Sequence, residues 1–309
     1  SSLVKSEEQR ISSRTNLRGM AGLVSSVLAG ACIVFALPPY SILPLGMVAF
    51  AVLSLLLRDA APMRALGLGY LFGLGQFVPG LFWVTESFQV DADRFGWLAL
   101  PAVLGLAAVL SVFPALACTL SARMARAGLP LALSLATSWT GLEWLRGHVL
   151  TGFPWNLAAY TLADWLPFAQ VASLVGSYGL GFLLVLCSAL VGLAFRAPAR
   201  RLQVIRFASA TAIAVTVAGF GVARLALSVP SSERGAHIRV VQPNIAQSAK
   251  WDEGSRKANI LRLLSLSARP GDYDILLWPE TAWPGFLAED TGARVMLGWL
   301  LPNTAVLLA

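Results

Sequence analysis

Residues 19–57 read GMAGLVSSVLAGACIVFALPPYSILPLGMVAFAVLSLLL and contain no charged side chain. A helix needs about 20 apolar residues to cross the hydrocarbon core of a bilayer, because it rises about 1.5 Å per residue. The stretch is therefore long enough for two crossings. Prolines at positions 38, 39 and 44 interrupt it, so we expect helices over residues 19–37 and 42–57. This stretch predicts a polytopic α-helical membrane domain.

The composition of the whole chain supports the same interpretation. Of its 309 residues, 57% are hydrophobic and only 13% are charged, with a mean hydropathy of +0.69. Soluble domains carry about 25% charged residues. The net charge of +7 belongs entirely to residues 1–224, which hold 15 basic and 8 acidic residues, whereas residues 225–309 hold 8 of each. A basic excess confined to the apolar part sets membrane topology, and we expect no nucleic-acid partner.

Five further apolar runs follow the first two, which predicts about seven transmembrane helices within residues 1–226. They are residues 65–85, 95–122, 127–142, 165–195 and 207–223. A signal peptide ending near residues 29–31 is the less favoured interpretation of the first run, since more spans follow it. With the N-terminus inside, the inner segments hold twelve Lys and Arg residues and the outer loops two, Arg94 and Arg146. This positive-inside bias places the residues after about 226 outside, in the periplasm of a Gram-negative cell.

Two of the predicted outer loops contain residues of interest. Residues 143–164 read EWLRGHVLTGFPWNLAAYTLAD. The aromatic residues fit an interfacial belt, which we favour for Trp144 and Trp165. Alternatively, residues 152–155 form a rigid loop that shapes a site at the membrane surface, with Phe153 and Trp155 as candidate substrate-binding residues. The loop over residues 86–94 is acidic. We expect Glu86 and Glu143 to lie in solvent at helix ends, with a proton relay as the alternative.

The pattern changes after residue 227 to that of an α/β domain. Residues 230–235 form a polar linker, and residues 237–245 and 273–278 are rich in β-branched and apolar residues, as strands are. We expect a helix over residues 251–268, a second over 291–301 and a third strand over 304–309. The first helix has a broad apolar face made of Ala258, Ile260, Leu261, Leu263 and Leu264. This order, βαβαβ, predicts a parallel sheet. A sheet whose edge has just begun is not a finished domain, so we expect the chain to be part of a longer protein.

One carboxylate stands out in this segment. Ligands of open parallel sheets bind beyond the carboxyl ends of the strands. The second strand ends at Trp278, Pro279 cannot continue the ladder, and Glu280 follows. Glu280 is therefore a candidate general base, although the spacing alone slightly favours a turn residue that caps the next segment. The three cysteines lie in apolar runs and fit buried small hydrophobes, and two histidines are too few for a histidine metal cluster.

Several motifs together resemble a known family. Residues 240–253 read VVQPNIAQSAKWDE and residues 276–281 read LLWPET, which is similar to the carbon–nitrogen hydrolase (nitrilase) superfamily. With many membrane helices in front, the chain resembles the bacterial apolipoprotein N-acyltransferases. Residues 36–40 (ALPPY), 67–83 (GLGYLFGLGQFVPGLFW) and 151–155 (TGFPW) are similar to the N-terminal half of that family.

The resemblance implies a function and a site. It implies a Glu–Lys–Cys triad in an αββα sandwich, with Glu280 as the catalytic glutamate and Trp251 in substrate handling. The lysine and cysteine are expected after residue 309, so the chain alone should be inactive. The implied reaction moves an acyl chain from a phospholipid to the N-terminal diacylglyceryl-cysteine of an apolipoprotein, through a thioester and without a metal or organic cofactor. The implied location is the bacterial inner membrane.

Two other functions remain open at this point. The first is a membrane-anchored amidase or nitrilase, which would not use phospholipid as an acyl donor. A single helix would anchor such an enzyme, so seven argue for a membrane domain that works on substrate. The second is a transporter or scaffold with a degenerate α/β domain. Its signature would be paired charges within the spans, of which the sequence shows few.

Overall fold

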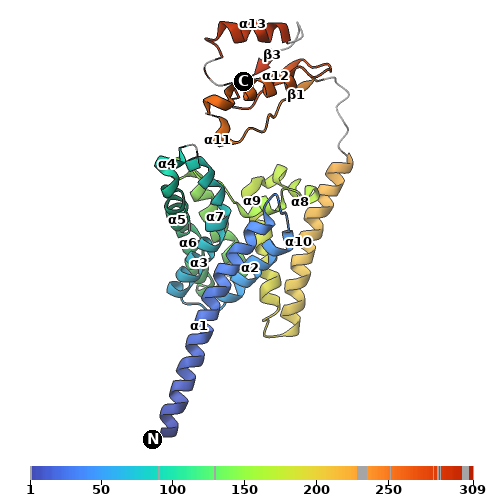
Figure 1. The fold of residues 1–309 in the computed structure, drawn as a ribbon. Helices are drawn as coiled ribbons and strands as arrows, with labels where there is room; N and C mark the ends of the chain where they lie inside the picture. Colours follow the sequence, from blue (N-terminus) through green and yellow to red (C-terminus); the bar gives the residue numbers. More distant parts are fainter. Residues whose placement is uncertain are drawn as a thin grey trace. The chain divides into compact units, whose positions relative to one another are not determined.

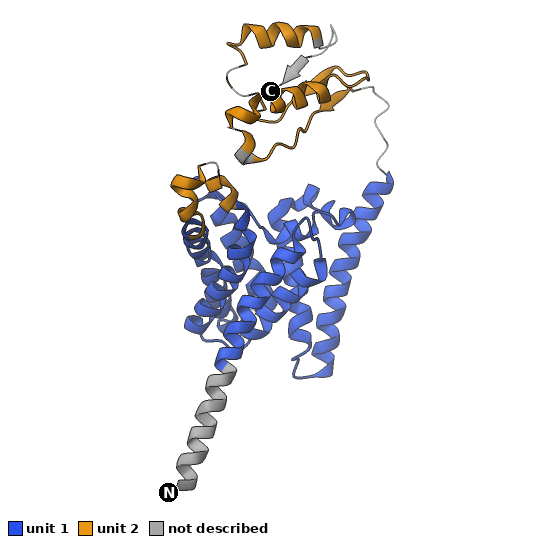
Figure 2. Cartoon of the chain, in the orientation of Figure 1, with its two compact units in different colours: residues 1–83, 101–228 blue, residues 84–100, 229–309 orange. Residues whose placement is uncertain are grey.

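The computed structural model describes residues 2–89, 91–128, 130–227, 235–250, 252–280, 282–283, 285, 287–300 and 306–308 (Figure 1). The chain divides into two compact units, which Figure 2 shows in two colours. One contains residues 1–83 and 101–228, and we call it the membrane unit. The other contains residues 84–100 and 229–309. Each unit is described by itself below.

The first ten helices of the chain are mostly long and apolar. They are α1 (Ser2–Ala36), α2 (Leu43–Leu57), α3 (Pro62–Gly80), α4 (Ala92–Phe95), α5 (Ala99–Leu110), α6 (Val112–Arg126), α7 (Leu131–His148), α8 (Leu166–Ala169), α9 (Ala172–Ala194) and α10 (Arg200–Leu227). Three short 3₁₀ helices connect them: η1 (Phe82–Gln89), η2 (Gly96–Leu98) and η3 (Ala158–Leu162).

The membrane character of this part is confirmed, whereas the count of seven crossings stays a prediction. Among the described residues, four helical segments are long and apolar enough to span a bilayer: Gly19–Ala36, Ala92–Arg126, Ala172–Ala194 and Arg200–Leu227. The bent pair of α3 and η1, with an angle of 42°, would be a fifth, and α2 is a shorter apolar helix. The chain thus has the helices of a multi-pass membrane protein.

Proline determines where several of these helices begin or break. Both α2 and α3 carry proline in their first turn, where its missing N–H is not needed. The expected run over 95–122 is interrupted at Ser111, between α5 and α6. Pro114 cannot donate to the carbonyl of Leu110 four residues before it, which explains a break at this point.

The helices of the membrane unit pack closely around an aromatic centre. Phe50, Phe72 and Trp139 have ring centroids 4.9–5.8 Å apart. Helices α1 and α3 cross with their backbones in contact, since a methyl group at Gly30 would overlap the carbonyl of Phe72. Small residues permit such close approach between membrane helices, where packing rather than water drives association.

The residues after position 235 form a small parallel sheet, as expected. Its strands β1 (Ile238–Val240), β2 (Ile275–Leu277) and β3 (Val306–Leu308) lie in the order β1-β2-β3. The helices between them are α11 (Gln247–Lys250), α12 (Glu253–Ser267) and α13 (Thr291–Leu300). All pairs are parallel, with Ile275 opposite both Ile238 and Val306. A complete nitrilase-like domain remains a prediction.

Two details of this segment differ from the expectation. The first strand is shorter than residues 237–245: its ladder ends at Val240, and the amide of Val241 still donates to the carbonyl of Leu277 (3.0 Å). Pro243, which has no N–H, follows closely. The apolar face of α12 is also narrower than expected. Leu263 and Leu264 pack against β2 residue Leu276, as the sequence predicted, whereas Ala258 and Leu261 are exposed.

Candidate functional site

Glu280 lies in the turn that follows β2, and its side chain is exposed. The strand end before it is firmly held. Trp278 is 3% exposed, its indole N–H donates to the hydroxyl of Ser267 (3.0 Å), and its ring stacks on Trp283 at 6.2 Å. Anchoring by a buried indole fixes the backbone two residues before the carboxylate. The carboxylate is thereby presented beyond the carboxyl end of β2.

The segment that contains Trp251 approaches the same turn. Trp251 itself lies outside the described residues, and its role in substrate handling stays a prediction. Its neighbour Lys250 donates from Nζ to the backbone carbonyl of Glu280 (3.2 Å). The structure thus brings Lys250, the first residue of the KWDE motif (residues 250–253), to the end of β2.

Asp252 begins α12 rather than lying within its first turn. Its carboxylate accepts from the hydroxyl of Ser255 (2.6 Å), from the amide of Ser255 (2.9 Å) and from the amide of Gly254 (3.4 Å). The hydroxyl of Ser255, followed by the backbone N–H groups, lowers the pKa of Asp252. This is an N-cap, which supplies acceptors to amides that have no partner in the first helical turn.

The second group of candidate residues lies in the membrane unit, in the loop that follows α7. Phe153 is half-buried and Trp155 is 52% exposed. Nη1 of Arg146 donates to the carbonyls of Phe153 (3.1 Å) and Trp155 (2.7 Å). The amide of Phe153 donates back to the carbonyl of Arg146 (2.9 Å). One arginine of α7 therefore holds both aromatic residues by their backbone.

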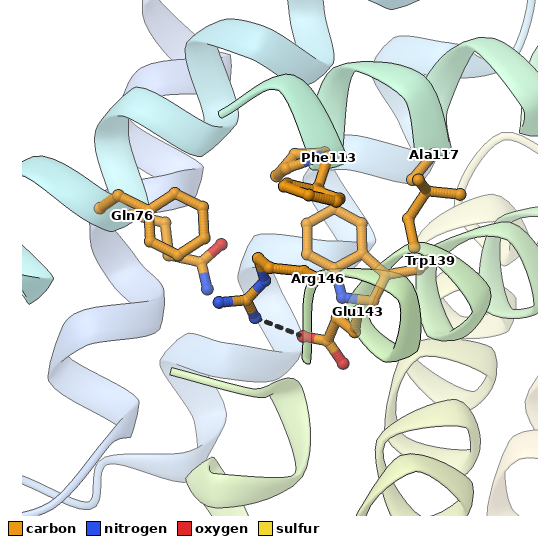
Figure 3. Close-up of a pocket in the computed structure, with 9 residues that line it drawn as sticks. Gln76, Phe113, Ala117, Trp139, Glu143 and Arg146 are labelled. Atoms are coloured by element: carbon orange, nitrogen blue, oxygen red, sulfur yellow. Dashed lines mark ion pairs between the residues drawn. The ribbon is translucent and has the colours of Figure 1, made fainter. Parts of the chain in front are cut away.

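This arginine is itself part of a buried ion pair, shown in Figure 3. Its Nη2 lies 4.0 Å from Oε1 of Glu143, and the two side chains are only 2% and 5% exposed. Glu143 Oε1 also accepts from the amide of Ala158 (2.9 Å), and the guanidinium lies over the ring of Phe77 (5.1 Å). We call Glu143 and Arg146 the clamp. The expectation of Glu143 in solvent at a helix end is wrong, because α7 continues to His148 instead of ending near residue 142.

Further contacts fix the loop from its other side. Nε2 of Gln76, which is 1% exposed, donates to the carbonyl of Asn156 (2.9 Å), and Nδ2 of Asn156 donates to the carbonyl of Gly80 (3.2 Å). Gly152 has φ +78°, and a methyl group there would overlap the carbonyl of Gly147. The loop over residues 152–155 is therefore tied to both α3 and α7.

The aromatic side chains of this loop form a partly exposed surface together with Trp83. The ring of Trp155 lies 5.4 Å from Trp83, which is 51% exposed, and 6.4 Å from Phe153. Trp83 and the clamp were not among the residues that we predicted from the sequence. The clue to the clamp was the spacing of Glu143 and Arg146, which places them on one helix face. The two groups of candidate residues, around Glu280 and around Trp155, lie in different units.

The described residues contain no group of three or more His, Cys, Asp or Glu side chains that could hold a metal ion. The three free cysteines lie in the membrane unit, on α1, α6 and α9.

The membrane unit resembles a domain of a known protein family. The family model for the apolipoprotein N-acyltransferase N-terminal domain matches residues 29–190, which is more than half of the chain. The chain belongs to the apolipoprotein N-acyltransferase family. The matched segment contains the clamp, the loop over residues 152–155 and Trp83.

Several bacteria contain similar proteins that are named apolipoprotein N-acyltransferase. The apolipoprotein N-acyltransferase of Bradyrhizobium diazoefficiens is 40% identical over 92% of this chain and 56% of its own length. That of Caulobacter vibrioides is 38% identical over 94% of this chain and 56% of its own length, and that of Rhodopseudomonas palustris is 36% identical over 94% and 57%. The chain thus spans a little over half the length of these members of the apolipoprotein N-acyltransferase family.

Proposed function

We propose that this chain belongs to an enzyme that transfers an acyl chain from a phospholipid to the N-terminal diacylglyceryl-cysteine of an apolipoprotein. The observation that carries the proposal is the family's membrane domain, followed in the same chain by a parallel strand and, in the turn after that strand, an exposed glutamate. Both proposed substrates carry acyl chains in a bilayer. A membrane enzyme can react them without extracting either from lipid.

The proposed chemistry is acyl transfer in two steps. Glu280 accepts the proton of a cysteine thiol, and the thiolate attacks the ester carbon of the phospholipid. The ester bond breaks, the glycerol oxygen takes the proton from Glu280 and leaves as a lysophospholipid, and a thioester remains. The α-amine of the apolipoprotein then attacks the thioester carbon, the carbon–sulfur bond breaks and the amide forms. Glu280 takes up the amine proton and passes it to the leaving sulfur, which restores the thiol. The resemblance to the family implies that the cysteine, and a lysine that stabilises the oxyanion, follow residue 309.

In this proposal the loop over residues 152–155 binds the acyl chain of the phospholipid. Phe153, Trp155 and Trp83 offer apolar rings that the clamp holds in place. Rigid aromatic side chains bury much apolar surface with little loss of conformational entropy. We place residues 1–226 in the membrane with seven crossings and the following residues in the periplasm, as the loop charges predict. The donor lipid would then come from the outer leaflet.

A substitution in the complete enzyme tests the role of Glu280. Glu280→Gln keeps the size of the side chain and removes the proton acceptor. In proteoliposomes with a phospholipid that carries a fluorescent acyl chain, we expect the hydroxylamine-sensitive acyl-enzyme to form at least about 10²-fold more slowly. Glu289→Gln is the matched control, since Glu289 is an exposed carboxylate of the same segment with no role in the proposal.

The assay also separates the alternatives. Acyl-enzyme formation at an unchanged rate in Glu280→Gln would remove Glu280 from the mechanism. An amidase or nitrilase would release ammonia from an amide or nitrile and leave the phospholipid intact. A transporter or scaffold would do neither.

A further inference from the structure

A cavity lies within the membrane unit, and none of its lining residues belongs to the clamp. It has a volume of about 100 Å³ and lies among α2, η3, α8, α9 and α10. Every lining residue is apolar, including Met47 of α2, Phe168 of α8, Leu184 of α9 and Val217 of α10. It is partly open to the outside of the chain. The cavity thus has no exposed polar group to hold water.

The packing of α10 accounts for the cavity. At Gly221, α10 touches the backbone of α8, because a methyl group there would overlap the carbonyl of Pro167. At Ala210, three turns earlier, the carbonyl accepts from the thiol of Cys187 on α9 (3.8 Å). These two contacts are about 16 Å apart along the helix at a rise of about 1.5 Å per residue. Ile213, Ala214 and Val217 line the cavity between them, so the fold holds α10 at both ends of a gap.

The surroundings of α10 determine what can fill this gap. Apolar cavities of this kind stay free of water, and an unfilled cavity costs stability. Of the most apolar window of α10, only 11% of the residues are buried, and Val215 and Val222 are 64% and 56% exposed. In a bilayer this exposed face contacts lipid tails. Hydrocarbon therefore surrounds the helix that lines one side of the cavity.

We propose that this cavity binds the end of one acyl chain of a bilayer lipid. An apolar cavity of about 150 Å³ holds one benzene molecule, so a cavity of this size takes a short length of chain and not a whole tail. The bound chain fills the gap between α9 and α10 and does not react. The inference rests on the cavity alone and is independent of the acyl-transfer activity proposed above.

Photochemical cross-linking in lipid nanodiscs tests the proposal. The probe is a phosphatidylethanolamine with a diazirine near the end of one acyl chain, and the labelled peptides are identified by mass spectrometry. We expect labels within the cavity-lining segment 180–187 and on Ile213, Ala214 and Val217 of α10. Ala214→Phe adds a ring to the cavity and should reduce this labelling by about tenfold. Val215→Phe adds a ring on the exposed face of the same helix and should leave labelling of residues 180–187 unchanged.

Each outcome decides the question. Loss of labelling in Ala214→Phe, with the melting temperature equal to or above that of the wild type, supports a filled acyl-chain site. If Ala214→Phe does not fold, Ala214→Leu adds a smaller group and the same comparison applies. Labels confined to exposed residues such as Val215 and Val222 would show ordinary surrounding lipid and overturn the proposal. Unchanged labelling of residues 180–187 in a folded Ala214 variant would also overturn it.

Discussion

The clamp makes a strong prediction about stability. Arg146→Met keeps much of the side-chain volume but removes the charge, and it leaves the carboxylate of Glu143 buried without its partner. The carbonyls of Phe153 and Trp155 lose their donor at the same time. Removing one member of a buried ion pair costs about 3–5 kcal/mol. Because both side chains are almost completely buried, water does not screen this cost.

A second substitution separates the charge from the hydrogen bonds. Glu143→Gln neutralises the carboxylate and keeps an oxygen that can accept from Ala158. The double variant Glu143→Gln with Arg146→Met therefore contains no unpaired charge. It should recover about 1–3 kcal/mol of what the single Arg146→Met variant loses. The two carbonyls still lack a donor, so we expect it to remain less stable than the wild type.

The measurement is equilibrium unfolding in mixed detergent micelles, with tryptophan fluorescence as the signal. Protease cleavage between residues 149 and 157 reports loosening of the loop in the folded state, and it should increase in both variants. A loss below about 1 kcal/mol in Arg146→Met would show that the pair contributes no more than an exposed one. A double variant no more stable than Arg146→Met would refute the reasoning about the unpaired carboxylate.

Three further predictions concern the backbone of the loop over residues 152–155, the close contact between helices α1 and α3, and the N-cap of α12. Gly152→Ala should lower the free energy of unfolding by about 1–3 kcal/mol, measured by the same method, because the residue has φ +78° and faces a carbonyl. Gly30→Ala should lower the melting temperature in detergent, since its methyl group would overlap the backbone of α3. The folded pKa of Asp252 is below its ordinary value, so its cap stabilises α12 above about pH 4 and is lost as the pH falls through the folded pKa. The protection factors of the amides of Gly254 and Ser255, which compare the measured exchange rate with the intrinsic rate at the same pH, should therefore fall in acid in the wild type and depend less on pH in Asp252→Asn.

Each of these three predictions has a control variant or an outcome that would contradict it. Gly141→Ala is the control for both glycine variants, because the space around that residue is open and alanine favours a helix. Equal stability of Gly152→Ala and Gly141→Ala would show that the loop tolerates a side chain at residue 152. A Gly30→Ala variant that melts with the wild type would contradict the close crossing of α1 and α3. Identical pH profiles for the wild type and Asp252→Asn would mean that the carboxylate does not cap α12.

Much of the architecture follows from local features of the chain. Uncharged apolar runs indicate membrane helices because a bilayer imposes a minimum length, and proline marks their starts and breaks because it lacks an N–H. The alternation of short apolar strands and helices indicated a parallel sheet, and its βαβαβ order is confirmed. The family motifs pointed to the same membrane domain that the family model matches.

What these local features did not show depends on contacts between distant residues. Glu143 and Arg146 look like solvent-exposed charges at the end of an apolar run, yet both are buried. Their burial requires the loop to fold back so that two carbonyls and an amide meet them, and α3 to supply Phe77. The apolar cavity beside α10 likewise depends on where Gly221 and Ala210 touch their neighbours. A hydropathy pattern records how much apolar surface each helix has, whereas burial and cavities arise from which helix surfaces meet in three dimensions.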